Sequence, residues 1–253
     1  MMVRLMSSIA LVVCSNVVLA QSSSEAIAAG DRAYAALQPA EALAHFEAAV
    51  AADSLSYEAR WKLSRSLVDL GESERDAGKQ RTLYKSAQAQ ARRAVELQPA
   101  DAEGHFSLAR ALGRAALSVG VRDRVKYAKD VRKEALLALA ADPRHAGALH
   151  VLGVWNAEVM RLNGMERFFA KNVLGGKVFG TASWKDAISY MEQAVAADPQ
   201  RLTHHLDLAK IYRDVGNKAK AREHFEIVVN GTATDFNDPA YKREAEAALK
   251  KLG

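Results

Sequence analysis

Two stretches of this chain, far apart in the sequence, share one pattern of small and large residues. "AEALAHFEAAVAADS" occupies residues 40–54, and "WKDAISYMEQAVAADP" occupies residues 184–199. The same spacing returns twice between them, at Ala87, Ala91, Ala94 and Pro99 and at Val131, Ala135, Ala138 and Pro143. A pattern that repeats within one chain predicts a repeat architecture, in which similar helical units stack in a row.

The most complete copy of the unit begins at Leu202 and reads "LTHHLDLAKIYRDVGNKAKAREHFEIVV". Its residue sizes follow the tetratricopeptide repeat, a hairpin of two antiparallel helices in about 34 residues. Small side chains stand where two helix backbones approach, and large ones fill the space between the helices. The residues that fit this pattern are Leu208, Ala209, Tyr212, Gly216, Ala221, Phe225 and Val228.

The repeats predict an all-α fold, a right-handed tetratricopeptide-repeat superhelix (an α-α solenoid), over residues 21–253. The scarcity of glycine and proline, 15 and 5 residues, agrees with a helical chain. Because successive repeat ends lie farther apart than one unit is long, we expect elongated hairpins. The repeats are expected at approximately 23–54, 57–99, 102–143, 146–199 and 202–233, followed by a capping helix at 239–252.

The first twenty residues have the composition of a secretory signal. Arg4 gives a positive start, "SSIALVVCSNVV" gives a short apolar stretch, and "VLA" resembles a cleavage site. We expect residues 1–20 to be removed before Gln21 and the mature protein to be exported to a periplasm. The alternative is a membrane anchor, through lipidation of Cys14 or an uncleaved N-terminus. Cleavage would remove the only cysteine, and with it any disulfide or thiolate ligand.

One insertion, residues 161–183, differs from the helical units around it. It contains four glycines and a cluster of apolar residues, among them Phe168, Phe169 and Phe179. We expect this cluster to form a small core that fills the longest hairpin, because so many apolar residues are costly to leave in water. The alternative is that the insertion binds a small molecule or lipid. A membrane-surface role would need the neighbouring basic residues to flank an exposed apolar face, and it is not predicted.

Three segments together resemble the regulator of microtubule dynamics family of tetratricopeptide-repeat proteins. They are "EARWKLSRSLVDLGE", "ERFFAKNVLGGKVFGTASWKDAISYMEQAV" and "HLDLAKIYRDVGNKAKAREHFEIVV". The resemblance covers approximately residues 25–252, and its most specific part is the insertion before Trp184. It implies the same solenoid and a scaffold role without catalytic residues, in an exported bacterial member of the family. Animal members are associated with microtubules and with mitochondrial or endoplasmic reticulum membranes, so a microtubule-associated regulator is a further alternative.

The first helices of successive repeats are expected to line the concave face of the solenoid. Two positions on them repeat bulky or basic residues across that face. Apolar anchors beside arginine and lysine would bind a peptide that carries a carboxylate or an acidic stretch. The alternative for each residue is structural, with bulky side chains packed under a neighbouring helix and basic ones paired with Asp or Glu. The candidate residues are Trp61, Phe106, His150 and Leu206 at the bulky position and Arg65, Arg110 and Lys210 at the basic one.

The sequence contains no motif that predicts an enzyme or a bound cofactor. A nucleophile elbow, a phosphate loop, a dinucleotide fingerprint and an HExxH motif are all missing from it. The seven histidines lack the spacing of metal ligands, and the net charge of +5, with acidic residues interleaved, is unlike a nucleic-acid-binding tail. We therefore expect a non-enzymatic scaffold that binds a protein or peptide, with no cofactor, metal or nucleic acid.

Overall fold

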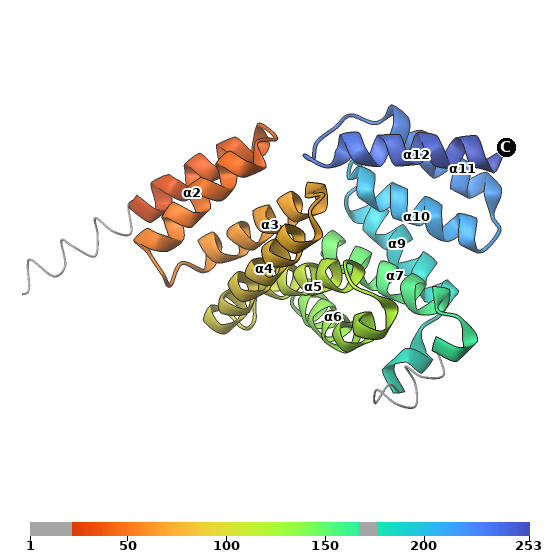
Figure 1. Cartoon of the computed structure of the whole chain (residues 1–253), viewed down its shortest axis with the longest axis horizontal. Helices are drawn as coiled ribbons and strands as arrows, with labels where there is room; N and C mark the ends of the chain where they lie inside the picture. Colours follow the sequence, from red (N-terminus) through yellow and green to blue (C-terminus); the bar gives the residue numbers. More distant parts are fainter. Residues whose placement is uncertain (1–21, 167–176) are drawn as a thin grey trace, which may run out of the picture.

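The computed structural model describes residues 22–166 and 177–253 of the chain. The regular secondary structure in these ranges is entirely helical, which confirms the predicted all-α fold (Figure 1). The expected signal at residues 1–20 lies outside the described residues. The described elements are a helix at 22–35, α2 (Pro39–Ala52), α3 (Tyr57–Ser73), α4 (Ala77–Leu97), α5 (Ala102–Leu117), α6 (Val121–Ala141), α7 (Ala146–Arg161), the short 3-10 helix η1 (Lys177–Thr181), α9 (Trp184–Ala197), α10 (Leu202–Asp214), α11 (Lys218–Asn230) and α12 (Asp238–Leu252).

Successive helices pair into hairpins that stack in a curved row (Figure 1). The pairs among the described residues are 22–35 with α2, α3 with α4, α5 with α6, α7 with α9, and α10 with α11, before α12 covers the last pair. This arrangement is the predicted tetratricopeptide-repeat solenoid. The first helix of each pair will be called an A helix and the second a B helix.

The hairpins in the middle of the chain are elongated, as expected. The A helices α3 and α5 have 17 and 16 residues, whereas α10 has 13. The B helices α4 and α6 have 21 residues each, whereas α11 has 13. Most of the additional length therefore lies in the B helices. The longest insertion does not extend a helix in this way, because α7 ends at Arg161 and α9 begins only at Trp184.

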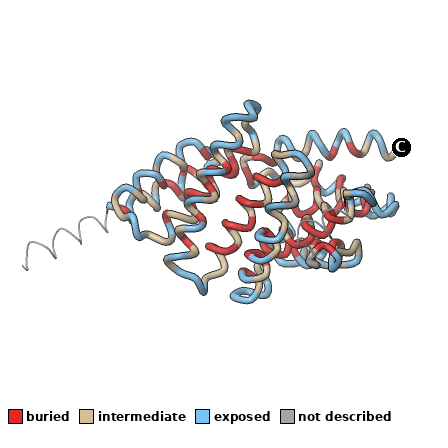
Figure 2. Tube along the Cα trace, turned by 60° about the horizontal axis from the view of Figure 1, so that its bottom comes forward, coloured by how far each residue is buried: buried red, intermediate tan, exposed pale blue. Residues whose placement is uncertain are grey.

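The repeated small and large residues form the core between the helices (Figure 2). Each B helix begins its buried face with a small or β-branched residue and continues it with alanine or one large side chain. Within the most complete copies, Phe46, Met191 and Phe225 have no exposed surface. Alanine at the remaining positions lets the backbones approach closely, so that packing reaches interior density. The fully buried alanines of the pattern are Ala42, Ala49, Ala87, Ala91, Ala94, Ala135, Ala138, Ala187, Ala194 and Ala221.

Each repeat ends and begins through local signals in the sequence. Pro99, Pro143 and Pro199 follow the last residues of α4, α6 and α9, where proline prevents the helix from continuing. After Pro99 and Pro143, side chains cap the next helices by accepting orphan backbone N–H groups. The Asp101 carboxylate accepts from Glu103 N at 2.9 Å, and Nδ1 of His145 accepts from Ala148 N at 3.1 Å.

Gly153 in α7 marks the closest approach of that helix to α9. A Cβ atom placed on Gly153 would lie 2.4 Å from Cγ of Met191 and 3.2 Å from the carbonyl oxygen of Ala187. We expect Gly153→Ala to lower the free energy of unfolding by about 1–3 kcal/mol, because the buried Met191 has no room to move aside. Chemical denaturation measures the change.

Gly113 in α5 is the matched control for that substitution. A Cβ atom there meets only Cγ1 of Val131, at 4.0 Å. Gly113→Ala should be neutral or stabilise the protein by up to about 1 kcal/mol, because alanine favours a helix interior over glycine. An equal loss of stability in both variants would contradict the close-approach explanation.

A polar contact joins α3, the A helix of the second hairpin, to the capping helix α12, between residues 168 apart in sequence. The side-chain amide of Asn237 donates to the carbonyl oxygen of Asp69 at 3.2 Å, and the Tyr241 hydroxyl donates to the carboxylate of Glu72. Both Asp69 and Glu72 belong to α3, whereas Asn237 caps α12 and Tyr241 lies in its first turn. In Figure 1 the start of α12 accordingly lies beside the end of α3. This contact, named here the clasp, closes the solenoid into a ring.

Candidate functional site

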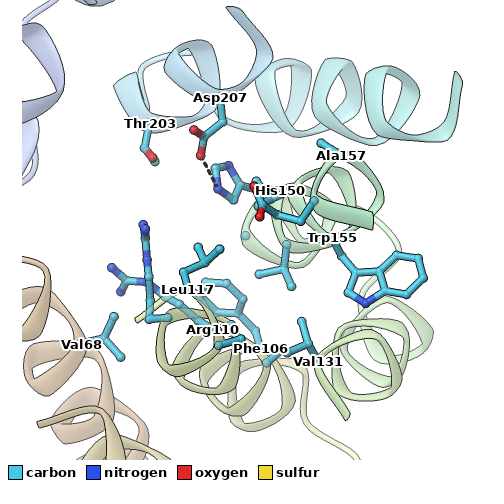
Figure 3. Close-up of a pocket in the computed structure, with 18 of the residues that line it drawn as sticks. Val68, Phe106, Arg110, Leu117, Val131, His150, Trp155, Ala157, Thr203 and Asp207 are labelled. Atoms are coloured by element: carbon cyan, nitrogen blue, oxygen red, sulfur yellow. Dashed lines mark ion pairs between the residues drawn. The ribbon is translucent and has the colours of Figure 1, made fainter. Parts of the chain in front are cut away.

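The ring of A helices surrounds a cavity of about 570 Å³. Its lining comes from the helix at 22–35, from α3, α5, α6, α7 and α10, and from Phe179 of η1, Asp198 after α9 and Tyr241 of α12. Figure 3 shows side chains from α3, α5, α6, α7 and α10 converging on the space between them. A volume of this size is typical of ligand-binding sites, which range over roughly 300–1,000 Å³. The cavity is therefore the candidate functional site.

One wall of the cavity is apolar and is built by α5, α6, α7 and η1. The rings of Trp155 and Phe179 stack with centroids 6.3 Å apart, and the Trp155 indole N–H donates to the carbonyl oxygen of Ala128 at 2.7 Å. Phe106 packs directly over Gly147, where a Cβ atom would lie 2.4 Å from the ring. The apolar residues that line this wall are Phe106, Leu117, Val131, Val151, Val154, Trp155 and Phe179.

The opposite side of the cavity rests on buried ion pairs between α3 and α5. Arg110 contacts Asp69 at 2.6 Å and Glu72 at 3.0 Å, and Arg114 contacts Glu72 at 2.9 Å. Asp69 also accepts a hydrogen bond of 2.9 Å from the Tyr34 hydroxyl. Burial alone would lower the pKa of Arg110, but Asp69 and Glu72 raise it well above its ordinary value. These arginines are charged, paired and structural.

A second polar cluster joins α7 to α10. Nε2 of His150 lies 3.3 Å from a carboxylate oxygen of Asp207, as the dashed line in Figure 3 marks. Nδ1 of His150 lies 2.9 Å from Nδ1 of His204. Burial, followed by the neighbouring His150, lowers the pKa of His204 to about 2. Burial would raise the pKa of Asp207, yet Lys210 and the hydrogen bond from His150 hold it far below its usual range. His204 is therefore neutral and Asp207 ionised.

Arg65 is the exception among the basic residues that line the cavity. Its guanidinium lies over the ring of Tyr34, 3.6 Å from the centroid, and 5.2 Å from that of Trp61. Its Nε is buried without a hydrogen-bond partner, and within the described ranges no carboxylate pairs with it. The other lining cations are held by acidic residues: Arg110, Arg114, Arg124, Arg161, Arg201 and Lys210. Arg65 is thus the cation available to a ligand.

The structure brings most of the predicted groove residues to one cavity. Trp61, Arg65, Phe106, Arg110, His150 and Lys210 all line it. Arg110 and Lys210 are nevertheless occupied, since Lys210 pairs with Asp207 at 3.1 Å and with Glu244 at 2.8 Å. For these two residues the structural alternative is the better description, because an acidic partner within the protein already neutralises each charge.

The expectation that Leu206 faces a partner is wrong. Only 1% of its surface is exposed, and it belongs to the core that α9, α10, α11 and α12 share. The capping helix α12 packs on α10, so this position lies inside the last repeat rather than on a free surface.

Of the three aromatic residues expected in the insertion, Phe179 joins the core. It is 5% exposed and packs in one cluster with Trp155, Val131 and Leu112 while also lining the cavity. Phe168 and Phe169 lie outside the described residues.

Several residues of the site carry no signal that sequence patterns could have detected. Tyr34 and Tyr241 come from the first and last of the described helices, and only the ring closure brings them to one cavity. Asp69 could have been found, because the sequence already left open that the basic residues pair with Asp or Glu, and Asp69 lies in a predicted first helix. The pairing of His150 with His204 depends on how α7 lies against α10.

Neither a metal-binding cluster nor a membrane-spanning helix is found among the described residues. No group of three or more His, Cys, Asp or Glu side chains in them could hold a metal ion. None of their helices is long and apolar enough to cross a membrane.

Comparison with known proteins places the fold and the family. Residues 26–253 match the family model described as regulator of microtubule dynamics protein 1-3. Regulator of microtubule dynamics protein 3 of Bos taurus is 25% identical over 194 residues, which are 76% of this chain and 41% of that protein. Protein 1 of Bos taurus is 24% identical over 171 residues, 67% of this chain and 53% of that protein. The chain thus spans about half the length of these relatives.

Solved structures share the solenoid. A thermophilic tetratricopeptide-repeat protein of Thermus thermophilus has a TM-score of 0.64 at 19% identity, covering 89% of this chain and 99% of that one. PilF of Pseudomonas aeruginosa has a TM-score of 0.50 at 14% identity, covering 92% of each chain. At these identities the likeness supports the fold alone.

Proposed function

Because this chain belongs to the regulator of microtubule dynamics family, whose tetratricopeptide-repeat fold suggests a scaffold for protein interactions, we propose that it is a non-enzymatic binding module. Its partner is a protein that inserts a short peptide segment into the cavity inside the ring. The partner and the mode of binding are both part of the proposal.

The observation that carries this proposal is the position of one unpaired cation beside an apolar wall. Arg65 lines the same cavity as Phe106, Trp155 and Phe179. A planar guanidinium binds a carboxylate through two parallel N–H donors, and an apolar pocket buries one large side chain. The ligand that fits is a short peptide with an acidic group at Arg65 and an aromatic or aliphatic residue against the wall.

Substitution of Arg65 tests the site directly. We expect a library of short labelled peptides to yield binders that combine an acidic group with a large apolar residue. Arg65→Glu should weaken these binders by about 30-fold or more, because truncating or reversing a desolvated charge partner costs about 2–5 kcal/mol. Fluorescence anisotropy with the purified protein measures the change.

Lys85→Glu is the matched control, since it makes the same change of charge on an exposed face of α4 away from the cavity. It should leave the affinity within about twofold, as expected of a distant surface charge in salt. Equal affinities in the wild type and in Arg65→Glu would refute the proposed site. Charge reversal at Arg110 or Lys210 is a poor test, because it would break ion pairs within the fold.

A second candidate function uses the same cavity. Its apolar wall also fits the chain of an amphipathic small molecule or lipid with an anionic group at Arg65. Native mass spectrometry of protein purified from its own cell envelope distinguishes the two. A co-purifying small molecule that Arg65→Glu removes would favour this candidate over the peptide.

We also propose that the protein acts after export, with residues 1–20 removed. N-terminal sequencing of the protein from the cell envelope should then begin at Gln21. A chain that starts at Met1, or one acylated at Cys14, would show a membrane anchor instead.

A further inference from the structure

The clasp is built on the turn at residues 234–238, which is held in place by hydrogen bonds of its own. One carboxylate oxygen of Asp238 accepts the backbone N–H groups of Thr234 and Asp235, both at 2.8 Å. Asp235 in turn accepts from the backbone N–H of Asn237 at 2.9 Å, and it pairs with Arg201 at 2.5 Å. Asp235, Asn237 and Asp238 are all buried. The turn is therefore a rigid support that presents Asn237 and Tyr241 to α3.

The clasp makes the cavity differ from the groove of an open solenoid. The lining residues come from both partners of the clasp, since Val68 of α3 and Tyr241 of α12 face the same space. An open groove accepts any stretch of an extended partner, whose chain leaves the groove at both ends. A ring admits such a stretch only if one end of the chain is threaded through it or if the ring opens.

We propose that the clasp selects the end of a partner chain, so that the cavity binds a terminal peptide rather than an internal segment. This inference rests on the proposed function and names its partner class. Asn237 and Tyr241 are then specificity-determining residues, although Asn237 need not touch the ligand.

The contact with Arg65 indicates which end of the chain is held. Arg65 is the unpaired cation of the lining. Among the lining carboxylates, Asp207 and Glu158 pair with cations and Glu103 lies 3.3 Å from His145, whereas Asp198 has no ion pair within the described ranges. A terminal carboxylate carries a full negative charge and fits the Arg65 guanidinium, where the proposed function already places the acidic group of the ligand. The held end is the carboxyl terminus.

The test uses the peptide that binds best in an Arg65-dependent manner, in four forms. These are the free peptide, its C-terminal amide, and fusions of a small folded domain to either end. With the wild-type protein, we expect the amide and the C-terminal fusion to bind about 30-fold more weakly or worse, since an unpaired or excluded group opposes binding. The N-terminal fusion should bind within about threefold of the free peptide.

Opening the clasp should remove part of this selectivity. In Asn237→Ala/Tyr241→Phe, the ratio of affinities between the free peptide and the C-terminal fusion should fall to less than about fivefold, because the ring no longer needs threading. The ratio is the readout, so a general loss of affinity does not affect it. A C-terminal fusion that binds the wild type as well as the free peptide would overturn the inference, as would an unchanged ratio in the clasp variant.

A head-to-tail cyclised form of the same peptide makes the test independent of the clasp variant. It should fail to bind the wild-type protein, because it has no end to present. Equal binding of the cyclic and linear forms would also overturn the inference. If no Arg65-dependent peptide exists, the proposed function itself fails. If one exists but its ends do not matter, only the role of the clasp fails.

Discussion

Asp69→Asn should lower the free energy of unfolding by about 3 kcal/mol, which for a chain of this size is a fall in Tm of about 10 °C. Asp69 has no exposed surface and binds both the Arg110 guanidinium and the Tyr34 hydroxyl. Removing its charge leaves Glu72 as the carboxylate within reach of both Arg110 and Arg114. The loss of one partner from a buried ion pair is costly because the remaining charge stays out of water.

The exposed Glu47→Gln is the control for Asp69→Asn, because it removes the same charge from the outer face of α2. It should change the free energy of unfolding by less than about 0.5 kcal/mol. Thermal and urea unfolding, followed by circular dichroism, measure both variants. If both substitutions cost the same, the ion pairs under the cavity do not stabilise the fold.

Acidification below pH 6.5 should destabilise the protein through His204. The unfolded His204 binds a proton near pH 6.5, whereas the folded one, with a pKa of about 2, stays neutral. The unfolded state therefore binds more protons as the pH falls, and the stability present above pH 6.5 is progressively lost. Between pH 6.5 and 4.5 the loss from this one residue is roughly 2–3 kcal/mol, at 1.36 kcal/mol for each pKa unit.

His204→Gln isolates this effect, because glutamine is neutral at every pH and can still hydrogen-bond His150. When both are unfolded in urea, the free energy of unfolding of the wild type should fall more steeply from pH 7 to pH 4.5 than that of the variant. His224, whose pKa burial and His205 also lower, acts in the same direction but is present in both proteins. Parallel pH profiles for the two proteins would contradict the assignment to His204.

Local physics in the sequence was enough to predict the helical hairpins. The spacing of Ala187, Met191 and Ala194 is dictated by the close approach of two helices, so the same spacing appears wherever that approach occurs. Proline at the repeat ends, such as Pro199, acts through the backbone of its own segment. These signals need no knowledge of distant residues, and they predicted the all-α solenoid and its elongated hairpins.

The candidate site was predicted only in part, because it depends on contacts between hairpins as well as on the face of each helix. A helix face can be assigned from sequence, so Trp61, Arg65 and Phe106 were expected on the concave side and do line the cavity. Whether a side chain on that face is free depends on what lies opposite it. Arg110 meets Asp69 from the neighbouring repeat, and Leu206 is covered by the packing of α10 with its neighbours.

By itself, the sequence determined the repeat unit, the helices and the face each helix presents, because each depends on residues within one hairpin. Only the tertiary structure decided that the row closes into a ring, since Asn237 and Asp69 meet through the summed curvature of all the hairpins between them. The packing of neighbouring helices decided which charges remain available. Six lining cations are neutralised by acids of the same helix or of elements packed beside it, and Arg65 is left without an acidic partner among the described residues.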